Sequence, residues 1–270
     1  MDVNERFDWE GRSIAWGRAG SGPPVVFCHG TPFSSRVWSR YADALSADFT
    51  VHLWDMPGYG ESSMHPDHAV DFGAQATAFA ALLEHWGLDR PHVVAHDFGG
   101  AVSLRATLAE KAAYASLMLV DVVAIPPSGS AFFQFVKRYP TTLDELPPYI
   151  HEAILRAYVR AASHRGLREH ELAELVAPWR TDDGQPAFYR QIAQYDEAFL
   201  AENERRLGDL SMPVKVLWGR DDAWIPPATG RRLAELIPGA SYAEVPDAGH
   251  LMQYDAPVAL ATALREWLYF

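Results

Sequence analysis

The sequence predicts an α/β protein: a mostly parallel central sheet flanked by helices, with a helical cap inserted after the sixth strand. Three observations support this fold class. Short, continuous apolar runs alternate with longer segments that carry apolar residues at helical spacing, as in parallel sheets buried on both faces. Between about residues 125 and 210 the pattern contains helices but no strand. The alternation then resumes, so residues 1–124 and 211–270 are assigned to a core domain and residues 125–210 to a cap domain.

The first part of the core domain begins with a hairpin, in which residues 6–9 and 13–16 pair across a turn at Glu10-Gly11. Four buried strands are expected after it, over residues 25–27, 51–54, 91–94 and 116–121. The helices expected between these strands run through residues 38–45, from about 72 to 86, and over 101–108.

The helices of the cap are expected over residues 148–162, 168–176 and 188–207. Loops rich in proline, glycine and serine, at 126–129 and 211–213, bracket this block as hinges. The core domain is then completed by strands at 214–218 and 241–245 and by helices near 231–236 and over 258–270. We expect the insertion to lie over the carboxyl ends of the strands, where open α/β sheets bind ligands.

Composition limits the classes of partner. A formal net charge of −12 over 270 residues argues against nucleic acid or an anionic membrane, because both need a basic surface. The single cysteine, Cys28, excludes an internal disulfide and fits a reducing compartment. The sequence shows neither an apolar leader nor a run of membrane length. We therefore expect a cytoplasmic protein, monomer or homodimer, that binds a small molecule.

The segment Ala95-His96-Asp97-Phe98-Gly99-Gly100 joins an expected strand to an expected helix. The small residues Ala95 and Gly99 allow a sharp turn with close packing of strand and helix. This context is typical of a nucleophile elbow, with Asp97 where serine is more common. A carboxylate, with a pKa near ~4, is ionised at neutral pH and can displace a leaving group from an sp³ carbon, which forms an enzyme ester. The alternative is that Asp97 only caps the helix.

Two further groups complete a predicted catalytic triad. His250 follows the last expected strand, and Asp222 follows the strand at 214–218. The order nucleophile, acid, histidine is the one expected for a hydrolase of this α/β architecture. Asp121, after the sixth strand, is the alternative acid. We predict that His250, oriented by the acid, activates the water that cleaves the Asp97 ester.

The segment His29-Gly30-Thr31-Pro32 follows the strand at 25–27. A backbone N–H at Thr31, with that of Phe98, is expected to form an oxyanion hole for the second step. The sequence contains no cluster with metal-ligand spacing, and the predicted chemistry needs no metal or organic cofactor.

Five motifs together resemble the α/β-hydrolase superfamily over the whole chain: those at 29–32, 55–62, 96–100, 218–222 and 248–250. The chain is most similar to the branch with an aspartate nucleophile, which includes epoxide hydrolases and haloalkane or haloacetate dehalogenases. The resemblance implies a cis bond at Thr31-Pro32. It also implies hydrolysis through a covalent intermediate, with either an epoxide or a carbon–halogen bond as the bond attacked.

The leaving-group residues decide between these substrates. The resemblance implies that a haloalkane dehalogenase carries tryptophan and asparagine at the positions of Phe98 and Thr31. It also implies that a haloacetate dehalogenase carries arginine at the position of Phe98. Because this chain has none of these residues at these positions, we favour an epoxide hydrolase. A dehalogenase is the alternative, and a non-catalytic small-molecule receptor is a third possibility that the intact triad argues against. The residues expected to contact the substrate or leaving group are Tyr189, His29, Trp38, Phe133 and Tyr139, with Tyr149 and Tyr158 left open.

Overall fold

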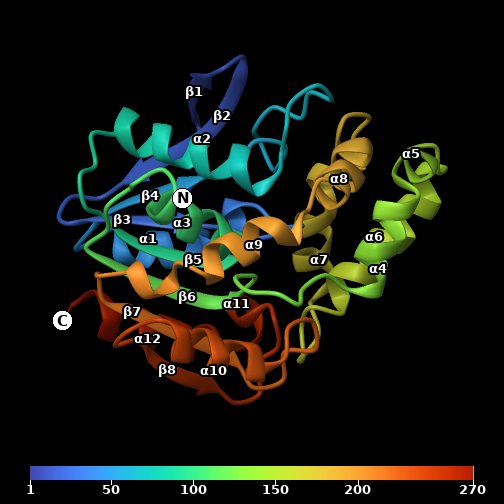
Figure 1. The fold of residues 1–270 in the computed structure, drawn as a ribbon. Coiled ribbons are helices and arrows are strands. Elements are labelled where there is room, and N and C mark those ends of the chain that lie inside the picture. Colours follow the sequence, from blue (N-terminus) through green and yellow to red (C-terminus); the bar gives the residue numbers. More distant parts are fainter. Residues whose placement is uncertain (270) are drawn as a thin grey trace.

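The computed structural model describes residues 1–269, apart from the side chain of residue 141. Its centre is an eight-stranded sheet with the strand order β1-β2-β4-β3-β5-β6-β7-β8 (Figure 1). The strands are β1 (Glu5–Trp9), β2 (Arg12–Ala19), β3 (Pro24–Cys28), β4 (Thr50–Trp54), β5 (His92–Asp97), β6 (Ser116–Val122), β7 (Val214–Gly219) and β8 (Ser241–Val245). The predicted fold class is confirmed.

Pairing in the sheet is parallel from β4 to β8, whereas β1 and β2 pair antiparallel with each other, and β2 also pairs antiparallel with β4. Every residue of β6 is buried. Because successive side chains of a strand point to opposite faces, this burial requires that both faces of the sheet are covered. The carboxyl ends of β5, β6, β7 and β8 therefore meet at one edge of a buried sheet.

The helices of the core domain lie close to where the apolar spacing predicts them, except for the short helix α11, which was not expected. They are α1 (Ser39–Leu45), preceded by the 3₁₀ helix η1 (Ser35–Trp38), α2 (Phe72–His85), α3 (Phe98–Leu108), α10 (Pro227–Leu236), α11 (Met252–Asp255) and α12 (Pro257–Leu268). The end of the helix expected over 258–270 falls on residue 270, which lies outside the described residues.

The insertion between β6 and β7 contains helices and no strand among its described residues. Its elements are α4 (Ala131–Arg138), α5 (Pro140–Asp144), α6 (Pro148–Arg160), α7 (Glu169–Val176), η2 (Ala177–Arg180), α8 (Gly184–Ala193), α9 (Glu197–Glu204) and η3 (Leu207–Asp209). Three of them, α4, α5 and η2, were not expected. The helix expected over 188–207 is two helices, because Asp196 caps a new one by accepting the N–H of Ala198 at 2.9 Å.

Helices α4 to α8 form a lobe beside the sheet, whereas α9 runs back along the core domain next to α3 (Figure 1). The amide of Asn203 in α9 donates to the carbonyl oxygen of Ala101 in α3 at 3.2 Å. The last part of residues 125–210 therefore packs on the core and not over the strand ends. The lobe contacts the core through Trp179, whose Nε1 donates to the carbonyl oxygen of Pro32 at 2.6 Å.

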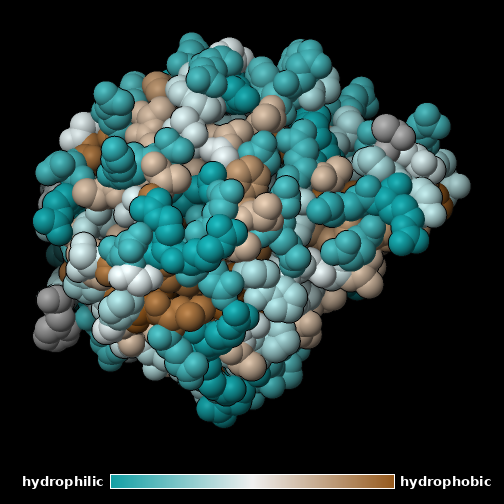
Figure 2. All heavy atoms as spheres, viewed as in Figure 1, coloured by the Kyte–Doolittle hydropathy of each residue, from teal (hydrophilic) through white to brown (hydrophobic). Residues whose placement is uncertain are grey.

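Most of the surface visible in Figure 2 is hydrophilic, with small apolar patches between the polar side chains. This fits a chain with an excess of acidic residues. Within residues 1–269, no helix combines the length and the apolar character needed to span a bilayer.

Candidate active site

Asp97 lies at the sharp turn between β5 and α3, with φ 48° and ψ −121°. Such a backbone conformation is costly for a residue with a side chain and is found where a site requires it. Two glycines make room for the turn. A Cβ on Gly30 would lie 2.3 Å from the Cβ of Asp97, and one on Gly99 would lie 2.6 Å from the carbonyl oxygen of His29. The predicted elbow geometry is therefore present.

The two oxygens of the Asp97 carboxylate have different surroundings. Oδ1 accepts the backbone N–H of Thr31 at 2.6 Å. Oδ2 lies 3.3 Å from Nε2 of His250. Phe98 begins α3, and the first N–H groups of a helix have no acceptor within it. Thus one carboxylate oxygen accepts the N–H of Thr31, one of the two groups expected to form the oxyanion hole, and the other oxygen faces the histidine.

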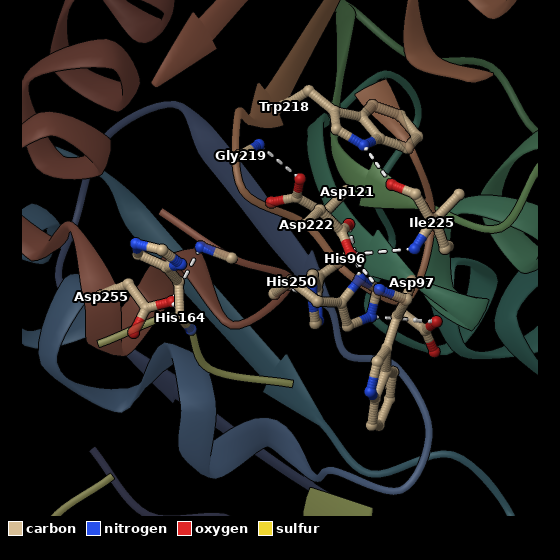
Figure 3. Close-up of polar contacts among 12 residues, drawn as sticks. His96, Asp97, Asp121, His164, Trp218, Gly219, Asp222, Ile225, His250 and Asp255 are labelled. Carbon is tan, nitrogen blue, oxygen red and sulfur yellow. Dashed lines mark hydrogen bonds and ion pairs between the residues drawn. The ribbon is translucent and has the colours of Figure 1, made fainter. Parts of the chain in front are cut away.

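Asp222 holds the opposite side of the His250 ring (Figure 3). Nδ1 of His250 lies 3.0 Å from Oδ2 of Asp222. The other oxygen, Oδ1, accepts the backbone N–H groups of Trp224 and Ile225 at 2.8 and 2.9 Å. These two bonds fix the carboxylate, which in turn orients the imidazole with Nε2 toward Asp97.

The alternative acid, Asp121, has other partners. Its Oδ1 accepts the backbone N–H of Gly219 at 2.6 Å, and its Oδ2 has no hydrogen-bond partner among the described residues. Complete burial, together with the nearby charge of Asp222, raises the pKa of Asp121 well above its ordinary value. The geometry therefore favours Asp222 as the partner of His250.

His250 is buried between two carboxylates. Burial alone would lower the pKa of its imidazole, but Asp222 and Asp97 outweigh burial and raise it well above the ordinary value. A change in the charge of Asp97 is thus transmitted directly to His250.

Two residues that the sequence analysis did not single out support the His250 loop. Nε2–H of His96 donates to the carbonyl oxygen of His250 at 2.9 Å, and burial lowers the pKa of His96 to about 3, so its ring is neutral. Asp255 accepts the N–H of Gly249 and that of His164 at 2.8 Å each. Asp255 therefore ties the loop that carries His250 to the segment after α6 (Figure 3).

A cavity of about 60 Å³ opens over Asp97. Its lining is Thr31, Asp97, Phe98, Val123, Ser128, Gly129, Ser130, Phe133, Tyr158, Trp224 and Ile225. Aromatic rings form one wall: Tyr158 stacks on Trp224 with centroids 4.5 Å apart, and Trp224 stacks on His250 at 4.9 Å. The cavity is thus mainly apolar, and none of its lining residues is cationic.

Comparison with known proteins agrees with this fold. The family model described as the alpha/beta hydrolase fold matches residues 23–257. The chain belongs to the α/β-hydrolase family. The solved structure of an alpha/beta hydrolase fold protein from Burkholderia ambifaria is 45% identical, covers 98% of both chains and has a TM-score of 0.95.

Two other comparisons concern α/β-hydrolases whose reactions are named. Haloalkane dehalogenase 2 of Mycobacterium bovis is 26% identical, over 96% of this chain and 93% of that protein. The solved structure of the epoxide hydrolase CorEH is 21% identical, with a TM-score of 0.84 and 98% of each chain covered. This chain is therefore an α/β-hydrolase with a haloalkane dehalogenase among its relatives, and its likeness to the epoxide hydrolase structure shows the shared fold.

Four of the expected substrate residues of this α/β-hydrolase do not line the cavity. Nδ1–H of buried His29 donates to the carbonyl oxygen of Gly30, while its Nε2 accepts the N–H of Met56, so His29 shapes the loop after β3. Trp38 is fully buried, and its indole N–H donates to the carbonyl oxygen of Cys28 at 3.2 Å.

The other two corrections concern tyrosines of the insertion. The hydroxyl of Tyr189 donates to Nδ1 of His151 at 2.9 Å, and the other nitrogen of that ring donates to the carbonyl oxygen of Trp179. Tyr189 is thus held within the lobe. Tyr139 is 44% exposed at the end of α4. Of the tyrosines left open by the sequence analysis, Tyr158 lines the cavity, whereas Tyr149 is exposed.

Other predictions for the site agree with the structure. Thr31, Phe98 and Phe133 line the cavity, and the Thr31-Pro32 bond is cis.

One group of side chains in the described part of the chain has metal-ligand spacing: His164, Asp221 and Asp247, whose ligand atoms lie within 4.8 Å of one another. All three are exposed, and Asp247 pairs with Arg165 at 3.6 Å. This group lies outside the cavity and takes no part in the chemistry considered below.

Proposed function

We propose that this hydrolase opens small, uncharged epoxides through a covalent ester on Asp97. The observation that carries the proposal is the arrangement of Asp97, His250 and Asp222 beneath an apolar cavity that contains one phenol, that of Tyr158. Helices α4 to α8 act as the cap that closes this cavity from water.

In the first step, Oδ2 of Asp97 attacks a carbon of the epoxide, and the carbon–oxygen bond of the ring breaks. The product is an ester between Asp97 and the substrate, with a tethered alkoxide that needs a proton. Tyr158 supplies that proton. Burial, and then the negative charge of Asp97, raise the pKa of the Tyr158 phenol well above its usual value, so the phenol remains protonated until the alkoxide forms.

In the second step, His250 takes a proton from water, and the resulting hydroxide attacks the ester carbonyl. Ester formation removes the charge of Asp97, which is one of the causes that keep the pKa of His250 high. The pKa of His250 should therefore fall once the ester exists. A lower pKa favours the neutral imidazole, which is the form that can act as the base in this step. The N–H groups of Thr31 and Phe98 stabilise the oxyanion. Its collapse breaks the ester bond, and the departing alkoxide takes the proton that His250 holds, which releases the diol. The proton of the remaining Asp97 carboxyl group returns to the Tyr158 phenolate, so that both residues regain their starting states.

A carbon–halogen bond is the alternative substrate. A departing halide needs donors, and the cavity offers none at the two positions that the family resemblance implies: Phe98 has an apolar ring, and the Thr31 hydroxyl donates to Gln191 at 2.6 Å. One observation favours a dehalogenase, namely that the indole of Trp224 lines the cavity. The phenol favours the epoxide, because an alkoxide is a much stronger base than a halide.

The test uses His250→Gln, which is expected to form the ester but not to cleave it. The variant is mixed with a small apolar epoxide or with a haloalkane of matched size, and intact-protein mass spectrometry followed by peptide mapping locates the adduct. We expect an epoxide adduct on Asp97 and none with His250→Gln/Asp97→Ala. The exposed His65 provides a control, since His65→Gln should turn over normally. An adduct elsewhere would refute the nucleophile, and one formed only with the haloalkane would replace the epoxide proposal.

A further inference from the structure

Three buried polar side chains meet beside Asp97, and one of them comes from the insertion. Oε1 of Gln191 in α8 accepts the hydroxyl of Thr31 at 2.6 Å and the hydroxyl of Tyr59 at 2.9 Å. Thr31 and Tyr59 belong to the loops after β3 and β4, and each of the three residues is at most 2% exposed. One amide oxygen thus joins the helical lobe to two loops of the core domain.

The Thr31 hydroxyl and the Thr31 N–H have different partners. The hydroxyl donates to Gln191, and the N–H donates to Oδ1 of Asp97 at 2.6 Å. Because the allowed rotamers of a side chain depend on φ and ψ, a hydrogen bond that fixes the Thr31 side chain also restrains the backbone that bears this N–H. Because the cluster is buried, a hydroxyl that lost Gln191 would be left without a partner or would turn to find another.

The cluster is held by an acceptor whose own donors are unpaired. Nε2 of Gln191 is buried and has no hydrogen-bond partner among the described residues. Burying an amide nitrogen in this way costs free energy. The two hydrogen bonds from hydroxyl groups are the favourable contacts of the Gln191 amide in this region. We therefore expect the fold to keep the oxygen of Gln191 directed toward Thr31.

We propose that Gln191 is a positioning residue: it couples the packing of α8 to the alignment of the Thr31 N–H that stabilises the oxyanion. The inference rests on the proposed Asp97 ester. It predicts that the step which develops the oxyanion, hydrolysis of the ester, depends on Gln191 more than ester formation does, since the proposed nucleophile is Oδ2 and the Thr31 N–H binds Oδ1.

The experiment compares Gln191→Met with Gln194→Met. Both remove an amide that joins the end of α8 to the core, since Oε1 of Gln194 accepts the N–H of Val70 at 2.7 Å, but only Gln191 contacts Thr31. Single-turnover kinetics should show ester hydrolysis slowed roughly 10-fold in Gln191→Met, less than the ~10²–10³ for losing an oxyanion donor. Ester formation should change less, and Gln194→Met should resemble the unmodified enzyme in both steps.

Two further measurements separate positioning from loosening of the lobe. Thr31→Ser keeps the hydroxyl and should slow ester hydrolysis less than Thr31→Val does. Thr31→Val should lose about as much as Gln191→Met, and the variant with both Thr31→Val and Gln191→Met should lose little more than either. The Thr31 amide proton, shifted downfield by its short bond to the carboxylate, should move upfield in Gln191→Met but not in Gln194→Met.

The outcomes distinguish two failures. An unmoved Thr31 amide proton, or equal hydrolysis rates in the Gln191 and Gln194 variants, would overturn the coupling. If His250→Gln shows no adduct on Asp97, the proposed mechanism fails, and the NMR comparison still decides whether Gln191 positions Thr31.

Discussion

Nδ1 of His250 lies 3.0 Å from Oδ2 of Asp222, and no comparable contact joins His250 to Asp121 among the described residues. Asp222→Asn should therefore favour the wrong imidazole tautomer and remove the charge that stabilises the imidazolium. By analogy with serine triads, turnover should fall by up to ~10⁴. Steady-state kinetics with Asp121→Asn as the comparison decides the assignment, and a larger loss in the Asp121 variant would reverse it.

Asp121 should instead affect stability, in a pH-dependent way. Its carboxyl has a raised pKa in the folded chain, so the folded state retains a proton that the unfolded state loses above about pH 3.9. The enzyme should accordingly lose stability as pH rises above this value, and Asp121→Asn should not. Urea unfolding measures the free energy of unfolding of both proteins. Relative to the unmodified enzyme, the variant should be more stable at about pH 8 than at about pH 5. A shift in the opposite direction would contradict the raised pKa.

The sequence could predict the strand ends because apolar runs and their order determine which residues meet at the edge of the sheet. Asp97, Asp222 and His250 all follow such runs, and the structure brings them together. The sequence could not predict which tyrosine of the lobe faces the cavity. That depends on how α6 and α8 rotate against each other: α6 presents Tyr158 to Trp224, and α8 presents Tyr189 to His151 and Gln191 to Thr31.

Tyr158 and Tyr189 can be separated by the same substitution. Tyr158→Phe should slow ester formation from an epoxide by ~10², because the alkoxide loses its general acid, and leave hydrolysis of a preformed ester unchanged. Tyr189→Phe removes a hydrogen bond inside the lobe and should cost about 1 kcal/mol of stability with little change in rate. Rapid-quench kinetics and thermal unfolding measure the two effects. If Tyr189→Phe slowed ester formation more, Tyr158 would not be the proton donor.

The titration of His250 should depend on the charge of Asp97. Asp97→Asn removes one of the two carboxylates that raise the pKa of His250, so this pKa should fall, as the ester is proposed to make it do. Because the pKa of His250 is raised in the folded state, its ion pair stabilises the folded state at pH values below about 6.5, the pKa of an unfolded histidine. This contribution is lost as the pH rises through the pKa of His250 in the folded state. Imidazole NMR titration of both proteins measures the change. An unaltered His250 titration would contradict the proposed activation of the base.

Gly30 should be essential because of its distance from Asp97. The Cβ of Gly30→Ala would lie 2.3 Å from the Cβ of Asp97, so the elbow or the loop after β3 must move. A displacement of this size at the nucleophile should lower the rate of ester formation by ~10² or more. Gly208→Ala is the control, since a methyl group there meets open space. Equal rates in the two variants would show that the elbow tolerates the displacement.

The cavity should also select substrates by charge. Its lining contains the Asp97 carboxylate and no cation, so a carboxylate-bearing substrate would be buried unpaired beside a like charge. Removing such a group from water costs several kcal/mol. Even part of this penalty should lower kcat/KM by at least ~10². The test compares an apolar epoxide with the same epoxide carrying a carboxylate in place of a methyl group, at low and high salt. Because screening by salt acts weakly on buried charges, the preference for the neutral substrate should persist at high salt. If the anionic substrate reacted as fast as the neutral one, a cation must reach the cavity, and the proposal of an uncharged substrate would fail while the Asp97 ester could still form.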